Sequence, residues 1–494
     1  MNSTQYNQLI IGAGFAGICT AIQLKKEGFN NFIILERGSH LGGTWRDNNY
    51  PGAACDVESH LYSFSFEQNP NWSRVFGPQQ EILNYMDHCV EKYGLNPYIQ
   101  LNTTVERLVF DEAQGVWQVV CNNGKTYFAQ SVISCSGGLS QPALPDIKGR
   151  DDFKGTMFHS AQWDHSYDLK GKTVAVIGTG ASAIQIVPAI APVVKELQLY
   201  QRTPPWIMPK MDGDISAFRR SMYNTLPFMR NFYRWRLYWF HELAAYGFTR
   251  HPALLKFASK IAARFLKQNV KDEALRRKLT PTYTMGCKRV LLTNDYYPAV
   301  QRKNVHLITE HIDEINATGI KTKDGIQHIP DAIVFATGFY AAEGVVVFDV
   351  RGKNGMSLNE AWKDGAEAYL GTSVAGFPNL FMVVGPNTGL GHSSMILMIE
   401  AQVHYILEAI KLMKKENFKS VDVKKETQTS FNTDLQQKLN KTVWQSGGCV
   451  SWYQTKTGKN VTLWPDYTFR FMRRTKKFEV EKYEIQRQGD ADLL

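Results

Sequence analysis

Two segments of the chain share one order of apolar and polar positions. In the first, an apolar run at 9–11 leads into a glycine-rich turn, a stretch of small and apolar residues, and a second apolar run at 32–35. The second segment repeats this order, with apolar runs at 173–177 and 197–200 around another glycine-rich turn. Such a pattern predicts strand, turn, helix and strand. We therefore expect an α/β fold with two Rossmann-like dinucleotide-binding domains.

The first unit carries a complete dinucleotide fingerprint. Gly12, Gly14 and Gly17 follow its first strand, and Glu36 ends its second strand. Glycines at this spacing let backbone amides approach a pyrophosphate at the helix N-terminus, and Glu36 would accept hydrogen bonds from a free ribose hydroxyl. The alternative is a glycine turn in an α/β unit that binds nothing, which the complete context disfavours.

The second unit differs at the tip of its second strand. Gly178 and Gly180 open the motif, and Arg202 and Thr203 follow the strand. Arg202 and Glu36 each lie 24 residues after the first glycine of their motif. A carboxylate there repels a 2′-phosphate, whereas an arginine with a neighbouring hydroxyl binds it. We therefore expect NADPH at the second site, although an ordinary surface arginine near a strand end is the alternative.

Features further along the chain favour FAD at the first site. The sequence LGGTW at 41–45 follows the acidic tip closely and would shape a loop around a long cofactor. Apolar strands at 130–138 and 328–339 would carry the chain out of the flavin domain and back to it. Flavin disulfide reductases share this layout, but they need a redox cysteine pair that this sequence lacks. The remaining possibility is a flavin enzyme in which oxygen, rather than a disulfide, reacts with the reduced flavin.

The expected domain boundaries follow from the two places where the chain leaves the flavin domain and returns to it. They are an FAD-binding domain formed by 1–145 and 325–494, and an NADPH-binding domain at 146–324 with a helical insertion at about 211–280. Within the insertion, residues 222–248 are rich in aromatics and arginine and predict one or two amphipathic helices. We expect these helices to pack on the NADPH domain. A face that borders the substrate entrance, or a weak contact with a membrane surface, is the alternative.

The composition is that of a folded globular protein, with 44% hydrophobic and 21% charged residues. No apolar run reaches the ~18 residues that span a bilayer, and the polar start MNSTQYNQ is not a secretory signal. The net charge of +10 forms no long basic tract, so attraction of an anionic cofactor explains it at least as well as nucleic acid does. Seven scattered cysteines without a CxxC motif predict reduced thiols and a cytoplasmic protein.

The linker between the two nucleotide units carries a specific motif. Phe153, Gly155, His159, Trp163 and Asp164 match the pattern FxGxxxHxxxW(P/D). Flanked by two glycine motifs, this pattern resembles the fingerprint of type I Baeyer–Villiger monooxygenases, which belong to the class B flavoprotein monooxygenases. The resemblance runs from about residue 6 to about residue 480 and includes the segments 50–66, 286–297 and 447–471.

The resemblance implies an enzyme that uses FAD, NADPH and O2. It would insert one oxygen next to a ketone carbonyl to give an ester or lactone through a flavin peroxide, with sulfoxidation as a side activity. The substrate would be a small hydrophobic ketone or sulfide. An N- or S-oxygenating flavin monooxygenase and a non-catalytic FAD/NADPH redox sensor stay open as alternatives. We expect no nucleic acid and no metal, because His159, His165, His392 and His404 lack metal-ligand spacing.

The family's functional positions carry over residue by residue. The resemblance implies that FAD contacts Gly12, Gly14, Gly17, Glu36, Trp45, Asp56, Val57, Tyr62, Val105 and Met395. It implies that NADPH contacts Thr179, Gly180, Ala181, Ser182, Ala183, Ile184, Gln185, Arg202, Thr203, Lys288 and Arg289. The family's essential arginine falls on Arg289, with Asp56 as its carboxylate partner, while His159 and Trp163 would couple domain movement to turnover. Two departures are Ala54, where some relatives carry arginine, and Ala183 at the end of the second glycine motif.

The expected chemistry supports a role for Arg289. An anionic flavin peroxide needs a fixed positive charge nearby, and arginine cannot lose its proton at working pH. A buried arginine in turn needs a carboxylate to compensate its charge, which Asp56 would provide. Without the resemblance, Lys288 and Arg289 would be an ordinary surface pair, and Asp56 could equally cap a turn.

Overall fold

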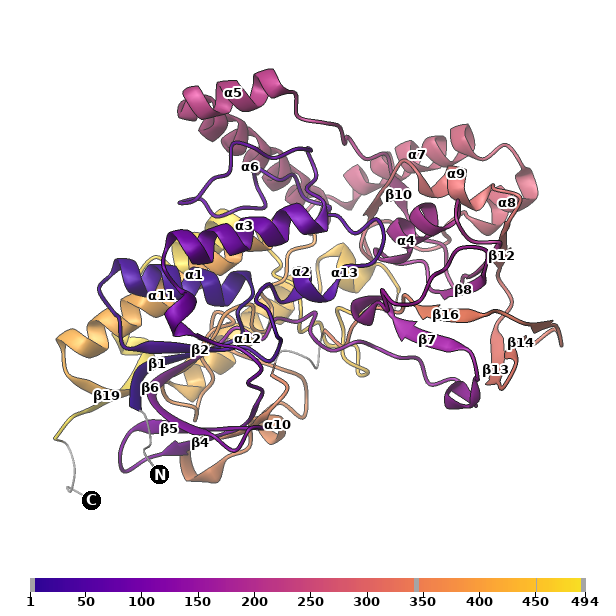
Figure 1. The fold of residues 1–494 in the computed structure, drawn as a ribbon. Helices are drawn as coiled ribbons and strands as arrows, with labels where there is room; N and C mark the ends of the chain where they lie inside the picture. Colours follow the sequence, from indigo (N-terminus) through magenta and orange to yellow (C-terminus); the bar gives the residue numbers. More distant parts are fainter. Residues whose placement is uncertain (1–4, 342–345, 450, 490–494) are drawn as a thin grey trace.

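The computed structural model describes residues 5–341, 346–449 and 451–489. Figure 1 shows two lobes, each built around a sheet with helices packed on it. The expected α/β class is therefore confirmed. Within the described part of the chain, no helix has the length and apolar character needed to cross a membrane.

The first sheet grows from the strand that precedes the first glycine motif. β1 (Gln5–Ile11) pairs in parallel with β2 (Phe32–Leu35) and β6 (Thr126–Ser134), and every residue of β2 is buried. The strand order is β17-β4-β5-β6-β1-β2-β3, with β18 also paired to β6. The other strands are β3 (Ile99–Gln100), β4 (Val105–Asp111), β5 (Val116–Cys121), β17 (Asp349–Arg351) and β18 (Leu380–Met382). The sheet is mixed, with β5 antiparallel to β4 and β6 and the strands from β6 to β3 parallel. Helices α1 (Phe15–Lys26) and α11 (Met395–Lys415) pack on each other along one side of this sheet (Figure 1).

The second sheet is parallel throughout, in the order β12-β9-β8-β16-β7. Its strands are β7 (Thr156–His159), β8 (Thr173–Ile177), β9 (Glu196–Tyr200), β12 (Val305–Ile308) and β16 (Ala332–Phe335). The boundary expected at 324/325 would assign β16 to the flavin domain, yet β16 pairs with β7 and β8. We therefore propose that the chain returns to the first domain only after β16.

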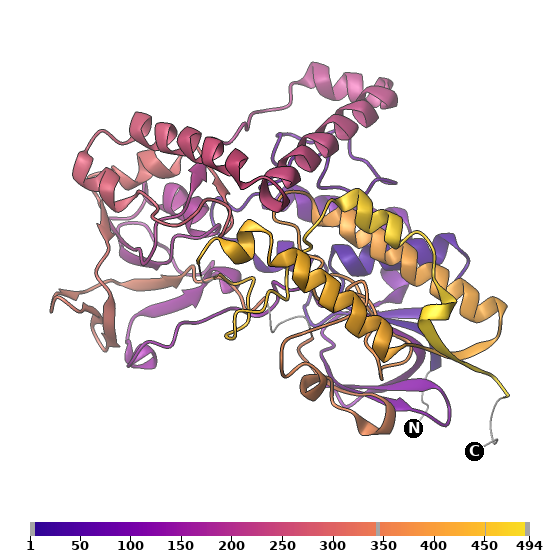
Figure 2. The ribbon, with the colours of Figure 1, turned by 180° about the vertical axis from the view of Figure 1, so that it is seen from behind.

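Four helices fill the expected insertion: α5 (Ala217–Thr225), α6 (Pro227–Thr249), α7 (Pro252–Asn269) and α8 (Glu273–Lys278). In Figures 1 and 2, α5, α6 and α7 follow the upper edge of the molecule. The expectation that α6 packs on the NADPH domain is wrong for its buried face. Arg234 donates to the carbonyls of His60 and Ser63, and Glu242 accepts from the Thr468 amide, so α6 is held by segments of the first lobe.

The remaining elements are short or peripheral. The helices are α2 (Thr44–Asp47), α3 (Gln79–Lys92), α4 (Ala183–Ile190), α9 (Tyr296–Val300), α10 (Leu358–Ala361), α12 (Lys425–Leu439), α13 (Val443–Ser446) and α14 (Thr468–Arg474). The strands are β10 (Ile207–Met208), β11 (Leu291–Leu292), β13 (Ile312–Asn316), β14 (Gly319–Thr322), β15 (Gln327–His328), β19 (Phe418–Val423) and β20 (Tyr483–Arg487).

Two cysteines depart from the prediction of reduced thiols. Cys287 and Cys449 form a disulfide across 162 residues of sequence, so the prediction is wrong for this pair. The other five are free and buried: Cys19, Cys55, Cys89, Cys121 and Cys135. Only the folded chain brings Cys287 and Cys449 together, because they lie in loops that approach each other from distant parts of the sequence.

Candidate active site

The first glycine turn has the geometry that its sequence predicts. Gly12 has φ +102°, and a Cβ there would lie 2.8 Å from the carbonyl oxygen of Cys135. A Cβ on Gly17 would overlap the Gly12 carbonyl oxygen. Gly14 precedes the first turn of α1, where no side chain caps the helix. Backbone amides are thus accessible at the end of β1, and the turn fits a cofactor pyrophosphate.

Glu36 follows β2 and is held beside this turn. It is 3% exposed, and its carboxylate accepts hydrogen bonds from the amides of Ala13 and Gly38, both at 2.8 Å. Arg46 Nη1 donates to the same carboxylate at 2.6 Å. The sequence reasoning missed Arg46, because nothing in the motif indicates which basic side chain reaches the strand tip. The three donors fix the orientation of Glu36 at the position where a ribose is expected.

The second glycine turn repeats this geometry with a different tip. Gly178 has φ +118°, and a Cβ there would overlap the carbonyl oxygen of Ala336, whereas a Cβ on Gly180 would meet nothing within 4 Å. Thr179 Oγ1 donates to the Thr203 carbonyl at 3.0 Å and joins the turn to the segment after β9. The open backbone at Gly180 fits a second pyrophosphate.

Two cations gather beside the second turn. Arg202 is exposed, and Lys288 reaches the same region from the loop before β11. Burial, together with the charge of Arg202, lowers the pKa of Lys288. Two neighbouring cations form an anion site, and they suit the 2′-phosphate that the sequence predicts here.

Gln185, expected to contact NADPH, links the two lobes in this structure. Its amide nitrogen donates to the Ala54 carbonyl at 2.9 Å, and its amide oxygen accepts from the Tyr50 hydroxyl at 2.9 Å. A Cβ on Gly52, which has φ +83°, would lie 2.7 Å from the backbone oxygen of Gln185. The N-terminal part of α4 is therefore in close contact with the loop that leads to Asp56.

Asp56 and Arg289, separated by 233 residues, form an ion pair. Asp56 Oδ2 accepts from Nε at 2.9 Å and from Nη2 at 2.5 Å. Their side chains are 31% and 32% exposed, so the pair is accessible. Burial acts to raise the pKa of Asp56, but Arg289 holds it below its ordinary value. The Asp56 charge raises the pKa of Arg289, so both groups are ionised at neutral pH.

Two further side chains lie near this pair, Lys210 and Tyr453. Lys210 donates to the Cys55 carbonyl at 3.3 Å and acts electrostatically on Asp56. Burial lowers the pKa of Lys210. Burial raises the pKa of Tyr453 to about 12, and the nearby charge of Arg289 opposes this shift. Lys210 belongs to no motif, and Tyr453 lies in the segment 447–471 without an expected role, so only tertiary structure identifies them as neighbours of the pair.

A pair formed by a histidine and a carboxylate lies next to the same loop. His241 on α6 donates from Nε2 to Glu58 at 2.7 Å and from Nδ1 to the His392 carbonyl at 2.7 Å. Burial acts to lower the pKa of His241, but Glu58 raises it above its ordinary value, as expected when both ring nitrogens donate. Glu58 follows Asp56 by two residues, so α6 is attached directly to the segment that carries the ion pair. The sequence gives no signal for this contact.

The other residues expected at the flavin lie in the first lobe. Trp45 Nε1 donates to the Tyr62 hydroxyl at 3.1 Å, and the two rings meet edge to face at 5.6 Å. Val57 is buried directly after Asp56 in the sequence. Val105 begins β4, and Met395 begins α11. The structure thus joins Trp45 to Tyr62, while Val105 and Met395 lie at the starts of two separate elements.

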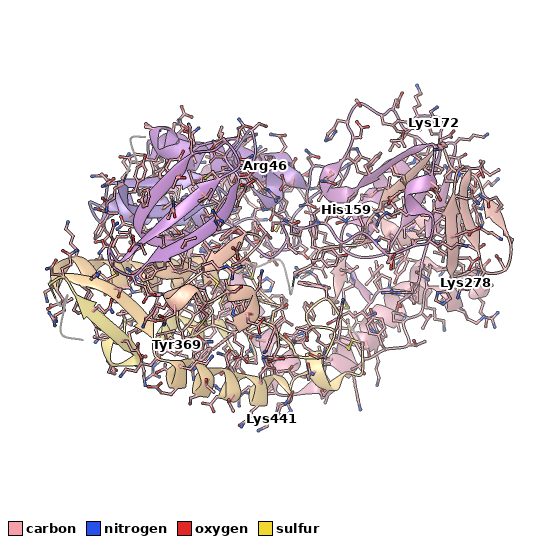
Figure 3. All side chains as sticks on the ribbon, turned by 90° about the horizontal axis from the view of Figure 1, so that it is seen from below. Arg46, His159, Lys172, Lys278, Tyr369 and Lys441 are labelled. Atoms are coloured by element: carbon pink, nitrogen blue, oxygen red, sulfur yellow. A yellow bond between two sulfur atoms is a disulfide. The ribbon has the colours of Figure 1, made fainter. Side chains whose placement is uncertain are left out.

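His159 and Trp163 lie in the second lobe, at the end of β7 and just after it. His159 Nδ1 accepts from the Ala161 amide at 3.1 Å, and its ring packs edge to face on Phe339. Burial lowers the pKa of His159. Trp163 packs on Phe158, with ring centroids 4.9 Å apart. In Figure 3, His159 lies on the side of its lobe that faces the lobe of Arg46.

Comparisons with known proteins match both lobes. The model of a family described as pyridine nucleotide-disulphide oxidoreductase matches residues 9–221, and the five cysteines in this segment are free. A Baeyer–Villiger monooxygenase from Pseudomonas aeruginosa is 49% identical over 477 residues, which cover 96% of this chain and 90% of that protein.

Two solved structures resemble the whole chain. The crystal structure of OTEMO in complex with FAD and NADP is 28% identical, covers 98% of this chain and 100% of its own, and has a TM-score of 0.87. That of cyclohexanone monooxygenase from Rhodococcus sp. Phi1 bound to NADP⁺ is 27% identical with the same coverage and a TM-score of 0.86.

Proposed function

The chain belongs to the Baeyer–Villiger monooxygenase family, and from this premise we propose the roles of its active-site residues. The protein is an NADPH- and O2-dependent flavin monooxygenase that converts ketones to esters or lactones. The Asp56–Arg289 ion pair is the observation that supports these roles, because it holds a permanent positive charge at an accessible position.

FAD and NADPH are the cofactors, and the two glycine turns fit them. The first turn, Glu36, Trp45 and Tyr62 would hold FAD, while Thr179, Arg202 and Lys288 would hold NADPH. Bound FAD would accept a hydride from NADPH and activate dioxygen, which is the redox chemistry that side chains cannot supply. The protein contributes binding, orientation and charge.

Arg289 supplies the charge in this proposal. Its guanidinium keeps its proton at any working pH and would stabilise the negative charge that develops during oxygen transfer. Asp56 holds the guanidinium through two donors and compensates its charge, so the arginine stays oriented. Asp56 stays ionised well below neutral pH, since Arg289 lowers its pKa. The pair therefore keeps its charge across the neutral range.

Gln185 is proposed to couple NADPH binding to the position of the Asp56–Arg289 pair. Its side chain bonds to Ala54, two residues before Asp56, and its backbone belongs to the helix of the second glycine motif. A cofactor bound at that motif would thereby hold the two lobes together and limit the access of water to the reacting oxygen. We propose small hydrophobic ketones as substrates, with sulfides oxidised as a side activity.

Product analysis tests the proposed roles. Purified protein is incubated with NADPH, labelled dioxygen and a panel of ketones, sulfides and amines. An ester that carries one labelled oxygen is the expected product. Arg289→Ala is expected to lower kcat for ester formation by about 10²–10³-fold or more, while reduction of the bound flavin by NADPH persists. Arg302→Ala, which removes an exposed arginine of the second lobe, is the matched control and should keep wild-type activity.

Other products would contradict the proposal. Heteroatom oxides without any converted ketone would indicate an N- or S-oxygenating flavin monooxygenase. Full ester formation by Arg289→Ala would remove this residue from the chemistry. Loss of flavin reduction in the same variant would instead assign Arg289 to NADPH binding alone.

A further inference from the structure

The excess of positive over negative charge in this protein comes from one helical segment. Residues 215–271 contain eleven of the 56 Lys and Arg but only one of the 46 Asp and Glu. This segment therefore accounts for the whole formal net charge of +10, and the rest of the chain is balanced. The segment comprises α5, α6 and α7.

The one acidic residue of this segment does not offset the surface charge. Glu242 is 2% exposed and accepts a hydrogen bond from the Thr468 amide. Of the basic residues, Arg234 is buried against backbone carbonyls of the first lobe. The other ten, at least partly exposed, are Arg219, Arg220, Arg230, Arg236, Arg250, Lys256, Lys260, Arg264, Lys267 and Lys271. The outer face of the helices is thus strongly cationic.

The same helices expose large apolar side chains at helical spacing. On α6 these are Phe228, Phe232, Trp235, Trp239 and Leu243, whose spacings of three and four residues place them in one stripe. Phe228, Phe232 and Trp235 are 66%, 62% and 56% exposed. Leu254, Phe257 and Ile261 form a similar stripe on α7, and Phe218 on α5 is also exposed. A soluble surface rarely exposes so many neighbouring aromatic residues unless they contact a partner.

We infer that α5, α6 and α7 dock on the surface of an anionic phospholipid bilayer. Aromatic and leucine side chains would enter the boundary between headgroups and acyl chains, and the flanking arginines and lysines would contact lipid phosphates. The three helices lie on the same upper side of the molecule (Figures 1 and 2). None of the described helices is long and apolar enough to cross a membrane, so the contact is a peripheral one.

A lipid surface fits these observations better than the other partners. A second copy of the chain would bring like charges together, because the cationic segment would face itself. Nucleic acid would neutralise the charge, but it offers no apolar layer for the leucine and isoleucine side chains. The docking does not depend on the reaction, although α6 also bonds to Glu58 beside the proposed active site. An enzyme bound in this way would take hydrophobic substrates from the layer in which they dissolve.

Vesicle sedimentation tests the docking with the whole protein. The probes are phosphatidylcholine vesicles with and without phosphatidylglycerol. We expect pelleting with the anionic vesicles, weak pelleting with the neutral ones, and loss of pelleting in ~0.5 M salt. The triple variant Arg236→Gln, Lys256→Gln and Lys260→Gln should lower the partition coefficient by roughly 100-fold. Phe232→Ser with Trp235→Ser should lower it by at least about tenfold.

Matched controls separate docking from general effects on charge or folding. Lys323→Gln, Lys425→Gln and Lys438→Gln remove three exposed lysines elsewhere, and Ile326→Ser with Ile329→Ser removes two exposed apolar side chains. Both controls should sediment like the wild type, and all variants should keep bound flavin. No pelleting with anionic vesicles, or equal pelleting of test and control variants, would overturn the inference.

Two further results would assign the face to another partner and so overturn it as well. One is a concentration-dependent dimer in sedimentation velocity that Trp235→Ser abolishes. The other is single-stranded polynucleotide that displaces the protein from vesicles and binds it more tightly. Because vesicle binding needs no turnover, it can fail while ester formation succeeds, and the reverse also holds.

Discussion

The two nucleotide units use the same turn but end in opposite charges. In each, the first glycine has a positive φ and lies against the backbone of the residue that follows a neighbouring parallel strand, Cys135 after β6 in one unit and Ala336 after β16 in the other. At the tip, however, Glu36 is buried among three donors, whereas Arg202 is exposed beside Lys288. Backbone sterics dictate the turn in both units, while the residue at the tip is free to differ.

The surroundings of the two tips also differ in rigidity. Glu36 is held by two backbone amides and by the Arg46 side chain, so its carboxylate is ordered before any ligand binds. Lys288 lies near Arg202 on a different loop, and the charge of Arg202 adds to the effect of burial in lowering the pKa of Lys288. We infer that the first unit is preorganised for a permanently bound flavin. In the second unit, a bound phosphate would instead relieve the repulsion between the two cations.

The largest effect is expected from a methyl group added to a glycine that has no room for one. Gly17→Ala places a Cβ on the Gly12 carbonyl oxygen and should destabilise the first unit by at least ~3 kcal/mol. The purified variant is expected to lack flavin, as measured from its absorbance near the flavin bands. Gly180→Ala is the control in the second unit, where a Cβ meets nothing within 4 Å, and it should keep its flavin. Flavin retained by Gly17→Ala would contradict the assigned turn.

A smaller effect should appear when the tip charge of the second unit is removed. Arg202→Gln loses a charged hydrogen-bond donor to the 2′-phosphate, which is worth about 1.5–3 kcal/mol. kcat/KM for NADPH should therefore fall by about 10–100-fold, while kcat/KM for NADH stays within about twofold. Lys170→Gln, an exposed lysine in the same lobe, should change neither value. An equal loss with both nucleotides would mean that Arg202 does not read the phosphate.

The smallest expected effect is a shift in pH dependence. Lys288 has a lowered pKa, so it loses its charge at a lower pH than an ordinary lysine, and binding of the 2′-phosphate weakens as pH rises through that value. kcat/KM for NADPH should decline on the alkaline side, since this ratio reports the free enzyme. In Arg202→Gln, the decline should move to higher pH, because one cause of the shift is gone. If the alkaline decline of kcat/KM is the same in Arg202→Gln and the wild type, Arg202 does not influence the pKa of Lys288.

Much of the fold was predictable because its signals are local. Apolar runs predict the strands β1, β2, β8 and β9, and the glycine spacing predicts the turns that follow β1 and β8. The expected boundary at 324/325 placed β16 in the flavin domain, whereas β16 pairs with β7 and β8, because an apolar strand at 332–335 looks the same in either sheet. The aromatic segment 222–248 was recognised as helical, but its sequence did not indicate which stripe of α6 would be buried.

The sequence by itself determined the two nucleotide turns, the opposite charges at their tips and the charge excess of residues 215–271. These depend on backbone sterics and composition within a few residues of one another. Only the tertiary structure decided that Asp56 pairs with Arg289, that Gln185 bonds to Ala54, and that Glu58 holds α6 by His241. Such contacts join segments more than a hundred residues apart, and their partners are selected by the packing of the whole chain rather than by any local pattern.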